Sequence, residues 1–481
     1  PPRPSLPLTL GCALGLWAFC ALILSLAEGW AREACLAVGG AAVLGSLAAA
    51  AGLWRGRASQ LWACLLGAAL GVACACGWAA AQHELAAAAQ GASGSWRLEA
   101  VEDGRQGSFG PSCVMRAVAD DGRAFLVRAS FDEGASVPRY GEVFEATASL
   151  EKPGESSAAY FWREGIVAEA RVQEARKVER GGVVGALVAA RSAAIDVIAG
   201  AGEGDGPAVL AALVCGWRGM LDEGDAYGAY QASGLAHLVA VSGAHLSIVA
   251  ACTMAVLRLA RVPRAAACAI EGGLLLSYLV LSGAPVSAVR AAVMAVAGML
   301  SFAARRRPAA LGALSVCIVG CVSLSPTTAL SVSFALSALS TLGIVLFAGL
   351  VASWVESAAP RVPRVVAEGL SLTFASSVMA TPLSAALFSQ LPLVAPVANV
   401  VAGPLFPLVC SAGLVACILC LAVPPLSPLL MPAATGAAGC MTGVVRALAS
   451  VPHASVPVSI PLSVALAASA GVAAALWLAW P

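Results

Sequence analysis

Apolar runs of near-spanning length dominate the chain and predict membrane-spanning helices. Three such runs open the sequence, near residues 8–27, 34–54 and 61–81. After a polar stretch, nine more follow, near 236–257, 265–282, 286–303, 309–324, 329–351, 367–390, 396–421, 428–449 and 458–480. About twenty apolar residues are enough to cross a bilayer as a helix. The pattern therefore predicts a polytopic α-helical membrane protein with about twelve spans.

The polar stretch between the two groups of runs has the pattern of a small β domain over residues 95–180. "CVMRAVADDGRAFLVRASF" predicts two short strands around a turn at Asp120–Gly122. "RYGEVFEATASLEKPG" alternates apolar and polar residues and predicts a second strand pair. Cys113 is the only cysteine here, so an internal disulfide is excluded. A five-stranded barrel of the OB type, inserted between membrane helices, is the simplest architecture that fits.

The segment that follows, residues 181–232, predicts amphipathic helices. Arg191 and Asp196 interrupt an apolar run between Gly181 and Gly200, which favours a helix lying in the membrane interface. The apolar run 207–217 is too short to span. The predicted organisation is three N-terminal spans (1–82), the OB-type domain (95–180), the interfacial helices (181–232) and a polytopic domain (233–481).

Composition agrees with a membrane protein and excludes a soluble one. The chain is 59% hydrophobic and only 11% charged, with a net charge of +1, whereas soluble domains carry about 25% charged residues. Nothing small and polar follows the first apolar run, so a cleaved signal peptide is not expected. No cofactor is indicated.

Arginine placement predicts the orientation, because basic residues favour the cytoplasmic side of a membrane. With about twelve spans, four basic clusters share one side, which puts the N-terminus inside and the β domain outside. Past residue 390 the topology is poorly constrained. The clusters are Arg55 and Arg57; Arg258, Arg261 and Arg264; Arg305, Arg306 and Arg307; and Arg361 and Arg364.

Polar side chains inside one predicted span mark a candidate site. "GLAHLVAVSGAHLSIVA" carries His237, Ser242 and His245, although the chain has only four histidines. Ser242 and His245 lie on one helix face, which raises a serine–histidine hydrolase as one alternative. No acidic residue in the span orients the histidine, and on a continuous helix both groups point outward. His237 and His245 are two turns apart, too far to share a metal ion on an unbroken helix. Close helix packing at Ser242–Gly243 and a polar passage for a solute are the other readings.

Two further polar residues belong to later spans. Arg290 is read either as an interfacial anchor or as a fixed charge facing an anionic substrate. Asn399 lies in a proline-rich run, where broken helices expose backbone groups in transporters. A simple loop between two spans is the alternative. The prolines concerned are Pro382, Pro392, Pro396, Pro404 and Pro407.

At these residues the sequence resembles the ComEC-type competence protein family, the inner-membrane channel for DNA uptake. "CGWRGMLDEGDAYGAYQASGLAHLVAVSGAHLSIVA" resembles its signature, with Arg218, His237, Ser242, Gly243 and His245 at the matching positions. "LSGAPVSAVRAAVMA", "SPTTALSVSFALSALSTLGI" and "PLVAPVANVVAGPL" resemble later segments in order, and include Arg290 and Asn399. "YFWREGIVAEA" resembles the end of the family's extracytoplasmic OB-type domain.

The resemblance implies a channel that carries single-stranded DNA across the bacterial cytoplasmic membrane during natural transformation. Its lining would include Arg218, His237, Ser242, Gly243, His245, Arg290 and Asn399. A DNA receptor, an ATPase and a nuclease are the implied partners. The alternatives are an intramembrane hydrolase or a transporter of another anionic solute.

Several features depart from the family pattern. Ala244 replaces a bulkier residue, and Ser325 stands where an Asp often precedes the proline. Many members end in a metallo-β-lactamase-like domain, but this sequence has no His-x-His-x-Asp-His cluster, so nuclease activity is not expected of it. We expect either a truncated chain or a short member.

Charge and aromatic content bear on DNA binding. From Gly234 onward there are ten Arg against three acidic residues, which suits a polyanion. The β domain has 12 basic and 15 acidic residues, so a strong grip on DNA is not expected there. Its candidate stacking residues are Trp96, Phe125 and Tyr140, with Phe109, Phe131 and Phe144 as further aromatics.

Overall fold

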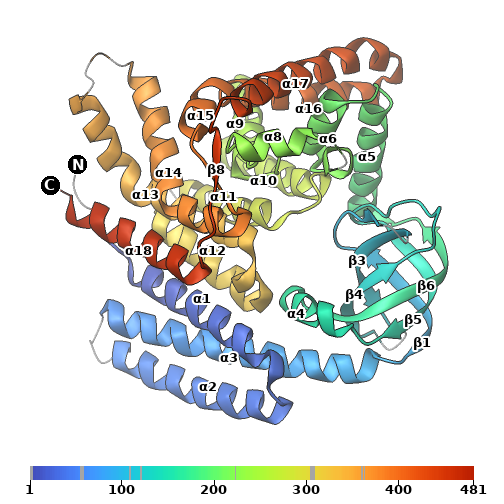
Figure 1. Ribbon diagram of the computed structural model, residues 1–481, viewed down its shortest axis with the longest axis vertical. Coiled ribbons are helices and arrows are strands. Elements are labelled where there is room, and N and C mark those ends of the chain that lie inside the picture. Colours follow the sequence, from blue (N-terminus) through green and yellow to red (C-terminus); the bar gives the residue numbers. More distant parts are fainter. Residues whose placement is uncertain are drawn as a thin grey trace. The chain divides into compact units, whose positions relative to one another are not determined.

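A computed structural model describes residues 4–54, 59–107, 110–119, 122–222, 224–303, 309–358, 361 and 363–480 (Figure 1). The chain divides into two compact units, each taken by itself below. The N-terminal unit joins residues 7–192 with 315–331. The C-terminal unit joins residues 193–314 and 332–481 with the first six residues.

Three long helices open the N-terminal unit: α1 (Leu8–Leu26), α2 (Arg32–Trp54) and α3 (Gln60–Ala89). Helices α1 and α2 each pack along α3 (Figure 1). Glycines allow α1 and α3 to touch, because a Cβ at Gly67 would lie 1.9 Å from the Cys12 carbonyl oxygen. Small residues favour this kind of backbone contact between membrane helices. Helix α3 continues eight residues beyond the predicted run 61–81 and leads directly into the sheet domain.

The sheet domain contains six strands and one helix. These are β1 (Ser93–Ala100), β2 (Arg105–Gly107), β3 (Gly110–Val118), β4 (Ala124–Ser130), β5 (Val143–Glu151), α4 (Glu155–Glu164) and β6 (Ile166–Val178). The strand order is β1-β5-β6-β4-β3-β2, and β1 also pairs with β3. Only the β4–β6 pair is parallel. Alternate residues of these strands, such as Leu98, Met115 and Val127, form a core of fully buried side chains.

The strand pair predicted on either side of Gly122 is confirmed as β3 and β4, which pair antiparallel. Asp120, Asp121 and Phe109 lie outside the described residues. The second predicted pair is wrong, because "RYGEVFEATASLEKPG" forms the single strand β5. This strand pairs with β1 on one side and with β6 on the other, which leaves no turn within it.

Helix α5 (Gly182–Ala199) contradicts part of its sequence interpretation. Arg191 does not form a polar face, because its side chain is only 1% exposed. Its two terminal nitrogens donate to the Asp103 carboxylate at 2.8 and 2.6 Å. The helix is 18 residues long and apolar enough to cross a membrane, so its interfacial location stays a prediction.

The remaining helices follow in chain order. They are α6 (Asp205–Cys215), α7 (Gly219–Asp222), α8 (Ala226–Ala232), α9 (Gly243–Leu259), α10 (Arg264–Leu281), α11 (Val286–Ala303), α12 (Ala310–Leu324), α13 (Val332–Ala358), α14 (Arg364–Phe388), α15 (Ala395–Ala402), α16 (Leu405–Ala422), α17 (Ser427–Ala449) and α18 (Leu462–Leu478). A 3₁₀ turn, η2 (Pro326–Leu330), follows α12, and two short strands, β7 (Gln390–Pro392) and β8 (Ser455–Pro457), pair antiparallel.

The core of the C-terminal unit is built around α6. This helix is buried from Pro207 to Cys215 and packs against α16 and α17 (Figure 1). A Cβ at Gly206 would lie 2.4 Å from the Thr435 carbonyl oxygen of α17, so the two backbones are in contact. Helix α6 is shorter than a membrane span, as its sequence predicts.

Nine helices in the described part of the chain are long and apolar enough to cross a membrane. The chain is thus a mostly helical membrane protein with a separate sheet domain, but the predicted number of twelve spans is not confirmed. The nine include α5, which the sequence did not predict as a span. Helices α9, α11, α12 and α18 are shorter apolar helices. Several arginines of the orientation pattern, Arg55, Arg57, Arg305, Arg306 and Arg307, lie outside the described residues.

Two predicted spans are divided in the structure. The run 236–257 becomes helical only at Gly243, because Ser242 has an extended backbone and caps the helix. The run 396–421 forms two helices, α15 and α16, separated at Gly403 and Pro404. Pro404 is the N-cap residue of α16, where a proline without an N–H is tolerated. Pro382, by contrast, lies within the continuous helix α14.

Candidate functional site at the start of helix α9

Ser242 and His245 form a capping box at the N-terminus of α9. The Ser242 hydroxyl accepts from the Ala244 N–H at 3.3 Å, and the His245 Nδ1 atom accepts from the Ser242 N–H at 3.2 Å. The two side chains therefore turn toward each other, with Oγ and Nδ1 3.4 Å apart. The expectation that both point outward is wrong, because it assumed a helix continuous through Ser242.

His245 is fully buried, with no exposed surface. Its ring meets Phe406 of α16 edge to face, with centroids 4.8 Å apart. Because Nδ1 accepts a backbone N–H, the proton of a neutral ring lies on Nε2. Among the described residues Nε2 has no hydrogen-bond partner. A buried N–H without a partner is costly, which marks this nitrogen as a place where water or a ligand would be bound.

Gly243 lets α9 approach α11 closely. A Cβ at Gly243 would lie 3.3 Å from the Cβ of Ala291, tighter than most side-chain contacts. The Ser287 hydroxyl of α11 donates to the Val241 carbonyl oxygen at 2.7 Å. These contacts fix the bend that precedes α9 against the first turns of α11.

Arg290 lies in the same part of α11, next to Ala291, and is 6% exposed. Its guanidinium donates to two hydroxyls of α13: Nε to Ser337 at 3.0 Å and Nη1 to Thr341 at 2.9 Å. The structure therefore contradicts the interpretation as a snorkelling anchor, because the charged group is directed into the bundle.

A glycine in the left-handed region joins the segment before α9 to the proline-rich segment. Gly234 has a φ of +74°, and a Cβ there would lie 2.6 Å from the Ala395 Cβ and 3.0 Å from Pro392. Asn399, one turn into α15, donates to the Ala395 carbonyl oxygen at 2.9 Å. His237 lies in the turns between Gly234 and α9, with an exposed side chain and its Nδ1 3.2 Å from the Gly234 carbonyl oxygen.

Arg218 occupies a separate position between α6 and α7. Its guanidinium lies over the Tyr227 ring of α8, 4.4 Å from the centroid, which is a cation–π contact. The preceding Gly216 caps α6 with a φ of +66°, and a Cβ there would lie 2.2 Å from the Ser282 carbonyl oxygen. The structure thus brings some of the signature residues together. Ser242, Gly243 and His245 meet at the start of α9, and Arg290 is the neighbour of Ala291, which Gly243 approaches.

The candidate stacking residues of the sheet domain pack against other side chains of the domain or of α5. Trp96 meets Phe125 edge to face, with centroids 5.8 Å apart, and the Trp96 indole N–H is buried without a partner among the described residues. The Tyr140 ring lies 5.9 Å from the buried Arg191 guanidinium. Phe131 and Phe144 pack on each other in the core, so they are not free to stack on bases.

Several residues of the site were missed from sequence. Phe406, Ser337, Thr341 and Tyr227 contact the signature residues, but they are ordinary apolar or hydroxyl residues of other helices. Only the repeated hydroxyls of α13, four residues apart, carried a signal, since Ser337 and Thr341 share one face. The described residues hold no group of three or more His, Cys, Asp or Glu that could bind a metal ion.

The class of protein that these features define is a polytopic membrane protein. Its helical bundle contains buried polar groups and is joined in sequence to a small sheet domain. A family model described as "Competence protein" matches residues 213–481, more than half of the chain. The chain belongs to the competence protein family, which associates it with DNA uptake in transformation. Searches of curated proteins and of solved structures each find no significant match.

Proposed function

We propose that the chain conducts single-stranded DNA across the bacterial cytoplasmic membrane during natural transformation. The observation that carries this proposal is the family match over residues 213–481, which includes every signature residue from Arg218 to Asn399. The receptor, ATPase and nuclease of the uptake machinery are proposed as partners, with single-stranded DNA as the substrate.

The polar chemistry of the site supports a passage for an anion. Arg290 places a buried guanidinium, hydrogen-bonded to two hydroxyl groups, among apolar helices, and a guanidinium is a preferred partner of phosphate. The buried Nε2 of His245 offers a hydrogen-bond donor at the start of α9, the helix whose Gly243 contacts Ala291 of α11. The excess of arginine over acidic residues from Gly234 onward favours a polyanion as well.

We propose no catalytic activity for the Ser242–His245 pair. Their separation of 3.4 Å is the one observation that favours a hydrolase. Against it, the Nδ1 lone pair of His245 already accepts the Ser242 N–H, and this interaction competes with general-base catalysis. On its other side the ring has Phe406 rather than an orienting carboxylate. The pair is better explained as a helix cap.

The sheet domain is proposed to be a barrel of the OB type on the extracytoplasmic side, with β1, β3, β4, β5 and β6 as its five strands and β2 as an additional strand beside β3. The pairing of β1 with both β5 and β3 supports a sheet that returns on itself, and the parallel β4–β6 pair supports the crossed connections of that fold. Arg258 in the last turn of α9, Arg261 in the loop after it and Arg264 at the start of α10 support a cytoplasmic location for this loop.

The proposal is tested by DNA uptake in competent cells that carry Ser242→Ala, His245→Ala or Arg290→Gln. Loss of one charge-assisted contact by Arg290→Gln is expected to lower transformation about tenfold or more. Ser277→Ala is the matched control, because its exposed hydroxyl donates to the Gly273 carbonyl oxygen within α10 and, among the described residues, to no signature residue. Normal uptake by all three site variants at wild-type protein levels contradicts the assignment of the channel lining.

A further inference from the structure

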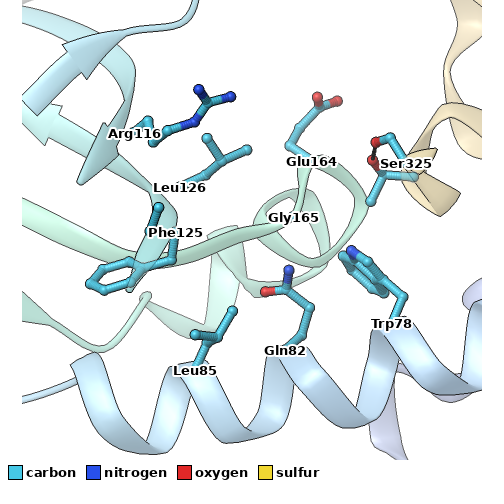
Figure 2. A pocket seen from close by; sticks show the side chains of 11 residues that line it. Trp78, Gln82, Leu85, Arg116, Phe125, Leu126, Glu164, Gly165 and Ser325 are labelled. Atoms are coloured by element: carbon cyan, nitrogen blue, oxygen red, sulfur yellow. Dashed lines mark hydrogen bonds between the residues drawn. The ribbon is translucent and has the colours of Figure 1, made fainter. Parts of the chain in front are cut away.

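A pocket of about 210 Å³ lies within the N-terminal unit, where the sheet domain meets the last turns of α3 (Figure 2). Four parts of the chain line it: α3, the β3–β4 pair, the junction of α4 and β6, and the residues around the start of η2. The side chains that matter below are Trp78, Gln82, Arg116, Glu164 and Thr327. None of them belongs to the proposed DNA passage.

Gly165 keeps this pocket open. It ends α4 in the left-handed region, with a φ of +73°. A Cβ at this position would lie 3.3 Å from Trp78 Cζ2 and 3.6 Å from Thr327 Cγ2, and would occupy the space between them. A turn that requires glycine therefore also leaves open the space between Trp78 and Thr327.

One cation and one anion lie at the mouth of the pocket. Figure 2 shows the Arg116 guanidinium and the Glu164 carboxylate on the side away from α3, with Gln82 and Trp78 on the floor. Neither charged group forms an ion pair with the described residues. Partial burial raises the pKa of the Glu164 carboxyl, as expected for a carboxylate that lacks a compensating cation.

The pocket lies where the apolar stretch of α3 ends, which is the level of the lipid headgroups if α3 crosses a membrane. The apolar stretch of α3 gives way to Gln82, His83 and Glu84 at this level. Trp78 and Trp162 meet edge to face at 5.1 Å, and the Trp162 indole N–H donates to the carbonyl oxygen of Leu24, near the end of α1, at 2.9 Å. Tryptophans gather where hydrocarbon meets headgroups.

We propose that this pocket binds the headgroup of a zwitterionic phospholipid, with its phosphate at Arg116 and its primary ammonium at Glu164. The paired opposite charges complement a phosphate and an amine better than they complement a polyanion. A DNA strand would bring repeated negative charge to Glu164 and to a domain that is net acidic. Gln82 and Thr327 supply hydrogen bonds to the remaining phosphate and ester oxygens.

Native mass spectrometry of the purified full-length chain with dihexanoyl lipids tests this proposal. We expect retention of phosphatidylethanolamine over phosphatidylglycerol in the wild type. Arg116→Gln should lower retention of both lipids about tenfold or more, since each loses a charge-assisted bond to phosphate. Glu164→Gln should abolish the preference for the amine while phosphatidylglycerol binding is kept.

Two exposed charges of the same sheet serve as matched controls. Arg97→Gln on β1 and Glu174→Gln on β6 change charge equally but lie outside the pocket, and we expect wild-type retention from both. Equal retention of the two lipids by the wild type, or an unchanged preference in Glu164→Gln, overturns the proposal. It is also overturned if inorganic phosphate competes as well as the lipid, or if a single-stranded oligonucleotide displaces the lipid through Arg116.

Discussion

Arg191 of α5 forms a two-pronged ion pair with Asp103 of the sheet domain, with N–O distances of 2.8 and 2.6 Å. Asp103 also accepts the Tyr140 backbone N–H at 3.0 Å. The pair therefore joins a helix of membrane-spanning length to the loop between β1 and β2. Its burial makes it sensitive to the loss of either partner.

Arg191→Met should destabilise the chain by about 3 kcal/mol, because it leaves the Asp103 charge uncompensated in a largely buried position. Chemical denaturation of the detergent-solubilised protein measures this change. Arg171→Met is the control, since its ion pair with Glu151 is mostly exposed and should contribute about 0.5 kcal/mol or less. Equal effects of the two substitutions contradict a structural role for the Arg191–Asp103 pair.

Gly243→Leu should separate α9 from α11 and destabilise the chain by about 1–3 kcal/mol, because the site has no room beyond a Cβ. DNA uptake is expected to fall with it. Gly273→Leu on α10 is the control, where a Cβ would meet nothing within 4 Å. Wild-type stability and uptake in Gly243→Leu would show that the α9–α11 contact is not required.

His245→Gln distinguishes the role of this residue in the helix cap from a role of its imidazole ring in DNA passage. A glutamine at the third helical position can still accept the backbone N–H of the N-cap residue, so α9 should be retained and the protein level kept. If the imidazole N–H serves the passage, uptake nevertheless falls to the level of His245→Ala. Uptake restored to wild type by glutamine would assign His245 a capping role alone.

Phosphatidylethanolamine retention should weaken as the pH falls, because protonated Glu164 no longer attracts an ammonium group. Burial raises the pKa of Glu164 in the free protein, so the weakening begins above the pH at which an ordinary glutamate titrates. Titrating the retained lipid by native mass spectrometry between pH 7 and pH 4 measures it. Glu164→Gln should show no such dependence, and a slope shared by the variant contradicts the assignment.

The apolar runs predicted most of the helices, because run length and apolar content decide whether a helix can cross a membrane. The predicted helix boundaries were wrong where a single residue started or ended a helix inside an apolar run. Ser242 starts a helix inside an apolar run, and Pro404 divides another. In the sheet domain, alternation predicted strands but not their partners, so β5 was read as two strands. Partners distant in sequence, such as Phe406 for His245, follow from the three-dimensional packing and have no local signal.

Helix α3 runs without interruption from Gln60 to Ala89, a length of about 45 Å at the rise of an α-helix. The joint to β1 is fixed, because the Gly91 N–H donates to Leu150 at 2.7 Å and the Leu150 N–H donates to Ala92 at 2.8 Å. No long flexible linker separates α3 from the sheet domain. A change in bilayer thickness that tilts α3 would therefore reorient the whole sheet domain, so lipid composition would set the angle at which this domain is presented.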